Sequence, residues 1–137
     1  MTPPTLLLDR SYLVALVASD HPAHHTIRSH YLTVVDQYRL NRLRPMALTD
    51  DLAYVDGVAR AGVLAPVETF HVAAQHRRAA AAVTAHVDPA VALVLVIARR
   101  EKIRRLATLD PVYQGFDIDL EPLIVANGES VAQSLAN

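Results

Sequence analysis

The most informative segment of this chain is Thr5-Leu6-Leu7-Leu8-Asp9-Arg10-Ser11-Tyr12-Leu13-Val14-Ala15-Leu16. Its unbroken apolar run, Leu6 to Leu8, is typical of a strand buried on both faces. Asp9 and Ser11 both favour the N-terminus of a helix, and the apolar residues after them recur with helical spacing. The segment therefore predicts a strand that turns into a helix at Asp9, which is where open α/β sheets bind their ligands. A helix cap without further function is the alternative role for Asp9.

A second strand that ends in an aspartate is predicted near the other end of the chain. The short run Leu106-Ala107-Thr108-Leu109 is followed by Asp110, and Pro111 prevents the strand from continuing. If the two strands are parallel in one sheet, their carboxyl ends share an edge, so Asp9 and Asp110 converge on one site. Carboxylates gathered in this way repel each other, and the usual reason for such a cluster is a hard divalent cation such as Mg²⁺ or Mn²⁺.

Two motifs resemble those of a known family. The pattern Asp-x-Ser-x-Leu-x-Ala-Leu at residues 9–16 and the pattern Leu-Ala-Thr-Leu-Asp at residues 106–110 are similar to the PIN domain, in particular to its toxin branch, the VapC-type ribonucleases of bacterial toxin–antitoxin pairs. The similarity covers nearly the whole chain. It implies a PIN-like α/β sandwich, with a small, mostly parallel sheet flanked by helices. It also implies metal-dependent hydrolysis of phosphodiester bonds in single-stranded RNA, with a small antitoxin and a second copy of the chain as partners.

The resemblance also implies roles for individual residues. In PIN toxins the second acidic residue is usually a Glu before an apolar helix, and Asp51, which precedes Leu52, matches that position. The carboxylates that it implies for catalysis and metal binding are Asp9, Asp51 and Asp110, and the hydroxyls that orient them are Ser11 and Thr108. Helix capping and the helix dipole are the alternative explanation for the acidic pair Asp50 and Asp51.

A third acidic residue is usual in PIN nucleases at the head of the long helix before the last motif strand. Counting back from Asp110 leads to Val91, which cannot bind a metal, and the nearest acid is Asp88, one turn earlier. Either Asp88 is a further metal ligand, or it only caps the helix and the third ligand is lost. Arg10 also stands where a threonine is common, so it places a positive charge beside the predicted site. A PIN-like binding or interaction module without catalytic activity is therefore the alternative function.

Length, composition and charge restrict the remaining possibilities. The 137 residues, 52% of them hydrophobic, predict one domain over residues 1–137 with a sizeable core, and a flexible tail over about residues 128–137. The formal net charge of −1 excludes a globally basic nucleic-acid binder, so any contact with RNA is local. The chain has no cysteine and no apolar run near the roughly 20 residues of a membrane span, so we expect a cytoplasmic protein without disulfides.

The remaining segments predict mostly helices. Helices are expected over residues 23–35, from Thr49 to about Ala61, and over residues 73–86. The nine apolar residues 90–98 fit a buried strand or a buried helix, and the preceding Asp88-Pro89 favours the helix. Short strands are expected over residues 46–48, 103–109 and 118–125. Residues 63–72 stay unassigned, because Pro66 argues against a central strand.

Two groups of polar side chains have alternative roles. The arginines form three groups, which are either solvated surfaces or local phosphate contacts: Arg39/Arg42/Arg44, Arg77/Arg78 and Arg99/Arg100/Arg104/Arg105. His21 and His25 are four residues apart, a spacing that can bind zinc on one face of a helix. No carboxylate follows them in the pattern of a metalloprotease, which favours surface histidines.

Overall fold

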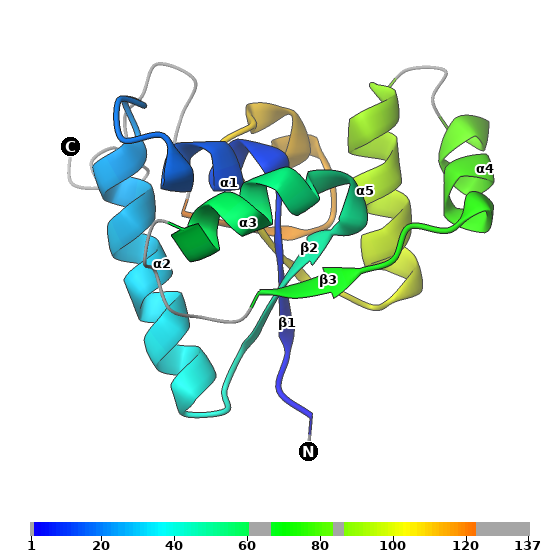
Figure 1. The fold of residues 1–137 in the computed structure, drawn as a ribbon. Helices are drawn as coiled ribbons and strands as arrows, with labels where there is room; N and C mark the ends of the chain where they lie inside the picture. Colours follow the sequence, from blue (N-terminus) through cyan, green and yellow to red (C-terminus); the bar gives the residue numbers. More distant parts are fainter. Residues whose placement is uncertain (1, 61–66, 84–86, 123–137) are drawn as a thin grey trace.

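The computed structural model describes residues 2–60, 67–83 and 87–122, which form a parallel sheet covered by helices (Figure 1). The strands are β1 (Thr5–Leu8), β2 (Arg44–Leu48), β3 (Glu68–Phe70), β4 (Arg105–Ala107) and β5 (Asp119–Glu121). The α-helices are α1 (Arg10–Val17), α2 (His24–Arg39), α3 (Leu52–Arg60), α4 (Ala74–Ala82) and α5 (Pro89–Arg100). Two short 3₁₀ helices, η1 (Thr49–Asp51) and η2 (Pro111–Gly115), follow β2 and β4.

Strand β1 lies at the centre of the sheet, whose order is β3-β2-β1-β4-β5. Leu7 is in register with Met46 of β2 on one side and with Leu106 of β4 on the other. All neighbouring strands of this sheet are parallel, so their carboxyl ends share one edge. Asp9 follows β1 at that edge, where its backbone N–H donates to the carbonyl oxygen of Ala107 at 2.9 Å.

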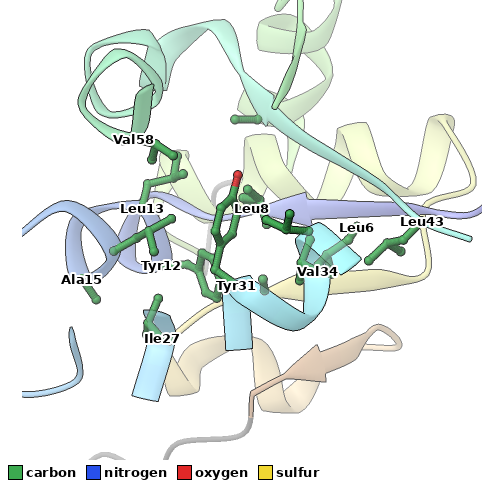
Figure 2. Close-up of a cluster of buried hydrophobic side chains, with 14 residues drawn as sticks. Leu6, Leu8, Tyr12, Leu13, Ala15, Ile27, Tyr31, Val34, Leu43 and Val58 are labelled. Carbon is green, nitrogen blue, oxygen red and sulfur yellow. The ribbon is translucent and has the colours of Figure 1, made fainter. Parts of the chain in front are cut away.

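The three consecutive leucines of β1 divide the core between two helical layers. Leu6 and Leu8 pack in a cluster with α1 and α2, in which Tyr12 is fully buried (Figure 2). Leu7 belongs to a second cluster, with Ile97 of α5. Because side chains alternate between the two faces of a strand, a strand covered on both faces must be apolar throughout. Figure 1 shows α1, α2 and α3 on one side of the sheet, and α4 and α5 on the other.

Helix α5 confirms the helical interpretation of the long apolar run. The Asp88 side chain caps the helix, because its Oδ1 accepts a hydrogen bond from the Ala90 N–H at 2.9 Å, and Pro89 is the first helical residue. Arg99 and Arg100 lie in the last turn, where positive charge interacts favourably with the helix dipole.

None of the described helices is long and apolar enough to cross a bilayer.

The α/β class with a small parallel sheet is confirmed, and the structure adds one strand in an interval for which the sequence predicted no element. The segment that stayed unassigned contains β3, which forms an edge of the sheet beside β2. A strand of three residues at an edge is compatible with a nearby proline, which argues only against central strands. Strand β5 lies at the opposite edge, within the predicted range 118–125. Pro66, the predicted helix end near Ala61, and the predicted tail lie outside the described residues.

Candidate functional site

A pocket of about 750 Å³ lies at the carboxyl edge of the sheet. The four aspartates of the predicted site all line it, although they come from different parts of the chain: Asp9 after β1, Asp51 in η1 after β2, Asp88 before α5, and Asp110 after β4. The hydroxyl-bearing Ser11 lines it too, as do Arg10 and His21. The parallel topology gathers these residues, because strands that run the same way end at the same edge.

Two hydroxyls hold the carboxylate of Asp9. The Oγ of Ser11 donates to Asp9 Oδ2 at 2.7 Å, and the Oγ1 of Thr108 donates to the same oxygen at 2.8 Å. The Ser11 Oγ in turn accepts from the backbone N–H of Leu109 at 3.0 Å, which ties α1 to the end of β4. The Asp9 side chain makes no capping hydrogen bond to α1. Its geometry is thus that of an oriented carboxylate and not that of a helix cap.

Asp110 is connected to the same network through Thr108. The backbone N–H of Asp110 donates to Thr108 Oγ1 at 3.0 Å, so this buried threonine lies between the two aspartates. The Asp110 side chain caps η2, where its Oδ1 accepts from the Val112 N–H at 3.0 Å. Since these contacts use neutral donors, the negative charge of Asp9 and Asp110 remains uncompensated by any of them.

Tyr113 is a site residue that the sequence interpretation missed. It lies in η2, lines the pocket, and is only 2% exposed. Burial raises the pKa of its phenol well above the usual range, and the charges of Asp9 and Asp110 and a hydrogen bond to Asp9 raise it further. The phenol therefore stays neutral beside the carboxylates. No local pattern identifies this role, since Tyr113 is an ordinary aromatic residue after Asp110-Pro111.

Asp51 lies on the other side of the pocket and forms an ion pair with Arg10. The Arg10 Nε donates to Asp51 Oδ1 at 2.7 Å, and the Asp51 residue is only 5% exposed. Burial raises the pKa of Asp51 above its ordinary value and the charge of Asp9 adds to the rise, whereas the hydrogen bond and the charge of Arg10 oppose it. The same hydrogen bond raises the pKa of Arg10, so the guanidinium remains charged.

Asp50, the neighbour of Asp51, has an arginine partner of its own. Both terminal nitrogens of Arg77 donate to the Asp50 carboxylate, Nη1 to Oδ2 at 3.2 Å and Nη2 to Oδ1 at 2.7 Å. Arg77 reaches it from α4, on the opposite side of the sheet from α1. Both acids of η1 are thus paired with arginines from elsewhere in the chain.

Val91, at the usual place of the third acid, has a dual environment. It lines the pocket, yet it is only 7% exposed and belongs to the core cluster of α5. Asp88 lines the same pocket and also caps α5. The wall at the start of α5 therefore carries one carboxylate, and that carboxylate already has a backbone partner.

The donor chemistry of the pocket suits a hard cation. Carboxylate and hydroxyl oxygens are the ligands that Mg²⁺ and Mn²⁺ prefer. Among residues 2–60, 67–83 and 87–122, no three acidic or histidine side chains lie close enough together to hold one ion jointly. Mg²⁺ is commonly bound by one or two carboxylates, with water and substrate phosphates as its other ligands, so a site of this kind does not need three clustered acids. The predicted zinc spacing of His21 and His25 is likewise without a third ligand in this part of the chain.

Comparison with solved structures identifies a neighbour with the same fold. No family model and no curated protein matches the chain. Among solved structures, the chain is similar to the crystal structure of VapC20 from Mycobacterium tuberculosis, which is described as a toxin that cleaves the sarcin-ricin loop. The TM-score is 0.57 at 15% sequence identity, over 80% of this chain and 93% of that chain. The two proteins share their fold, and the fold of this chain is therefore PIN-like.

Proposed function

We propose that this protein is a metal-dependent endoribonuclease that hydrolyses phosphodiester bonds of single-stranded RNA. The observation that carries the proposal is the convergence of Asp9, Asp51, Asp88 and Asp110 on one pocket at the carboxyl edge of a parallel sheet. The PIN-like fold, shared with a toxin that cleaves the sarcin-ricin loop, supports the same activity. An acidic pocket of this kind attracts divalent cations, and a bound Mg²⁺ commonly takes phosphate oxygens of the substrate as further ligands.

In this proposal Asp9 and Asp110 would hold Mg²⁺ or Mn²⁺. When bound, the cation supplies a lowered pKa for an attacking water and stabilisation of the leaving oxygen. Ser11 and Thr108 keep the Asp9 carboxylate in a fixed orientation, and the buried, neutral Tyr113 lies beside it. Asp51 and Asp88 line the same pocket, where Asp51 pairs with Arg10 and Asp88 caps α5.

The proposed setting is that of a toxin. A small antitoxin and a second copy of this chain are the partners that the resemblance implies, in the cytoplasm. Exposed apolar side chains offer contacts to such partners, namely Val112, which lines the pocket, Leu52 directly after η1 and Phe116 directly after η2.

A PIN-like module that binds RNA without cleaving it is the second candidate. Two observations favour it: Arg10 pairs with the Asp51 carboxylate, and the buried Val91 replaces the usual third acid. Few free carboxylates make a weak Mg²⁺ site.

The decisive experiment compares wild type with Asp9→Asn. We expect wild type to cleave a single-stranded RNA with Mg²⁺ or Mn²⁺ and to lose the activity in EDTA. The amide oxygen of the variant still accepts the hydrogen bonds from both hydroxyls, so we expect the fold to persist. Mn²⁺ affinity, measured by calorimetry, should fall by more than the roughly 10- to 100-fold that is typical when a group hydrogen-bonded to a metal ligand is removed. Cleavage that persists in EDTA would disprove the metal assignment. RNA binding without cleavage under any condition would favour the second candidate.

A further inference from the structure

Arg10 is the only lysine or arginine among the described residues that line the pocket. It is the first residue of α1, directly after Asp9, and its side chain is 52% exposed. The other charged lining residues, His21 aside, are aspartates. The aspartates repel the phosphates of an RNA strand that enters this pocket. A positively charged side chain at this place therefore favours RNA binding.

The ion pair with Asp51 uses only part of the Arg10 guanidinium. This group carries five N–H donors, and the bond to Asp51 is made by Nε alone. The four N–H donors of the two terminal nitrogens have no hydrogen-bond acceptor in the described part of the chain. The buried Asp51 carboxylate therefore holds the guanidinium at Nε. The two terminal nitrogens stay unpaired, and together they can make a bidentate contact with a phosphate.

The neighbouring pair of Arg77 and Asp50 shows the opposite arrangement. Arg77 has a nearly equal exposure of 54%, but both of its terminal nitrogens are bonded to Asp50. It does not line the pocket. Two arginines thus pair with two consecutive aspartates, and only Arg10 keeps a free donor edge at the site.

We propose that Arg10 binds a phosphate of the RNA backbone at this pocket, and that Asp51 is a positioning residue which orients Arg10 for this contact. The inference rests on the proposed function, because it assumes that the bound polymer is RNA. It assigns the two sides of the pocket to different partners: Asp9 and Asp110 to the cation, and Arg10 to the phosphate beside it. It also changes the role expected for Asp51, from a metal ligand to the support of an arginine.

The test compares Arg10→Gln with Arg77→Gln, which remove the same charge from two similar ion pairs. Binding of a single-stranded RNA of about twelve nucleotides is measured in EDTA, where no cleavage occurs, as a function of salt concentration. We expect Arg10→Gln to weaken RNA binding by about tenfold or more. The negative slope of the logarithm of the association constant against the logarithm of salt concentration should also become shallower by roughly 0.7, the value for one phosphate contact on a single strand. Arg77→Gln should leave the slope unchanged. Equal effects of the two substitutions, or an unchanged slope for Arg10→Gln, would overturn the proposal.

The positioning role is tested with Asp51→Asn and Asp51→Leu, which both remove the negative charge. Asn keeps an acceptor for the Arg10 Nε, whereas Leu does not. If only charge matters, both variants bind RNA more tightly than wild type. If Asp51 orients Arg10, the Leu variant binds several-fold more weakly than the Asn variant, with thermal melting as the check that both are folded. Equal affinity of the two folded variants would overturn the role of Asp51.

The outcomes also separate this inference from the proposed function. If wild type never cleaves RNA but its binding depends on Arg10 as described, the hydrolytic function fails and the phosphate contact stands. If wild type cleaves RNA and Arg10→Gln binds RNA like wild type but takes up Mn²⁺ more tightly, the function stands. In that case Arg10 is only an internal counter-ion of Asp51, and the inference fails.

Discussion

The two sides of the pocket hold their carboxylates by different means. On the side of β1 and β4, neutral groups hold Asp9 and Asp110: two hydroxyls bond to the first, and a backbone N–H bonds to the second. On the side of β2, the arginines Arg10 and Arg77 hold Asp51 and Asp50. Neutral donors orient a carboxylate without cancelling its charge, whereas an arginine cancels it. The negative potential is therefore concentrated on the side of β1 and β4, which is where a cation should bind.

The largest expected effect is on metal affinity and compares one aspartate from each side. Asp110→Asn keeps the oxygen that caps η2 but loses the charge, so we expect Mn²⁺ affinity to fall by roughly a hundredfold. Asp50→Asn should change it by less than about threefold, because Arg77 already neutralises that carboxylate. Titration calorimetry of both variants measures the difference. Similar losses in both would show that the two sides contribute equally to the metal site.

The second prediction removes the hydroxyl that connects Asp9 and Asp110. Thr108→Val conserves the shape of a side chain that is 4% exposed, but it leaves the Asp110 N–H without its acceptor and Asp9 without one donor. We expect a loss of about 1–3 kcal/mol in the free energy of unfolding, seen as a lower melting temperature, together with weaker Mn²⁺ binding. Thr33→Val is the control, because the exposed Thr33 only bonds the His30 carbonyl in its own helix. A melting temperature equal to that of the control would show that the hydroxyl network is not important for stability.

The third prediction compares the ion pair between β4 and β5 with the ion pair between β2 and β3. Glu121 of β5 bonds Arg105 of β4 and also His30, with a side chain that is 22% exposed. Burial tends to raise the pKa of Glu121, but the hydrogen bonds from His30 and Arg105, together with their charges, hold it below its usual value. A lowered folded-state pKa stabilises the protein above the unfolded-state pKa, and this contribution is lost as the pH falls through the folded-state value.

Glu121→Gln should therefore cost about 1–2 kcal/mol of unfolding free energy at pH 7. The difference from wild type should shrink toward zero as the pH falls below about 4 and wild-type Glu121 becomes protonated. Glu68→Gln is the control on the other side of the sheet, where Glu68 pairs with Arg44 and is 45% exposed, and there we expect a small effect at any pH. Chemical denaturation at several pH values gives both curves. A Glu121→Gln deficit that does not depend on pH would contradict the assignment.

The smallest effect is expected at the start of α5. Asn caps helices as well as Asp does, so Asp88→Asn should change the unfolding free energy by less than about 0.5 kcal/mol. Thr108 bonds both Asp9 and the backbone of Asp110, whereas no hydrogen bond in the described part of the chain joins Asp88 to it, so we also expect Mn²⁺ affinity to change by less than about threefold. A loss of Mn²⁺ affinity as large as that for Asp110→Asn would identify Asp88 as a metal ligand. The start of α5 would then bind the cation together with the ends of β1 and β4.

Features that depend on local pattern and on topology were predictable from the sequence. The run Leu6 to Leu8 specified a central strand, because a strand covered on both faces must be apolar at every position. Asp88-Pro89 specified the start of α5 through capping and a fixed backbone angle. The placement of Asp9 and Asp110 at one pocket was also predictable, because any two parallel strands of a sheet end at the same edge.

The partners of these residues, in contrast, are visible only in the folded chain. Arg10 reaches Asp51 across 41 positions of sequence, Tyr113 is buried beside Asp9, and β3 forms an edge from a segment with no clear strand pattern. Each of these contacts depends on the angles at which helices and turns pack on the sheet, and residue type and spacing do not specify those angles. The sequence could therefore indicate which carboxylates meet, but the charge that each of them keeps is set by long-range packing.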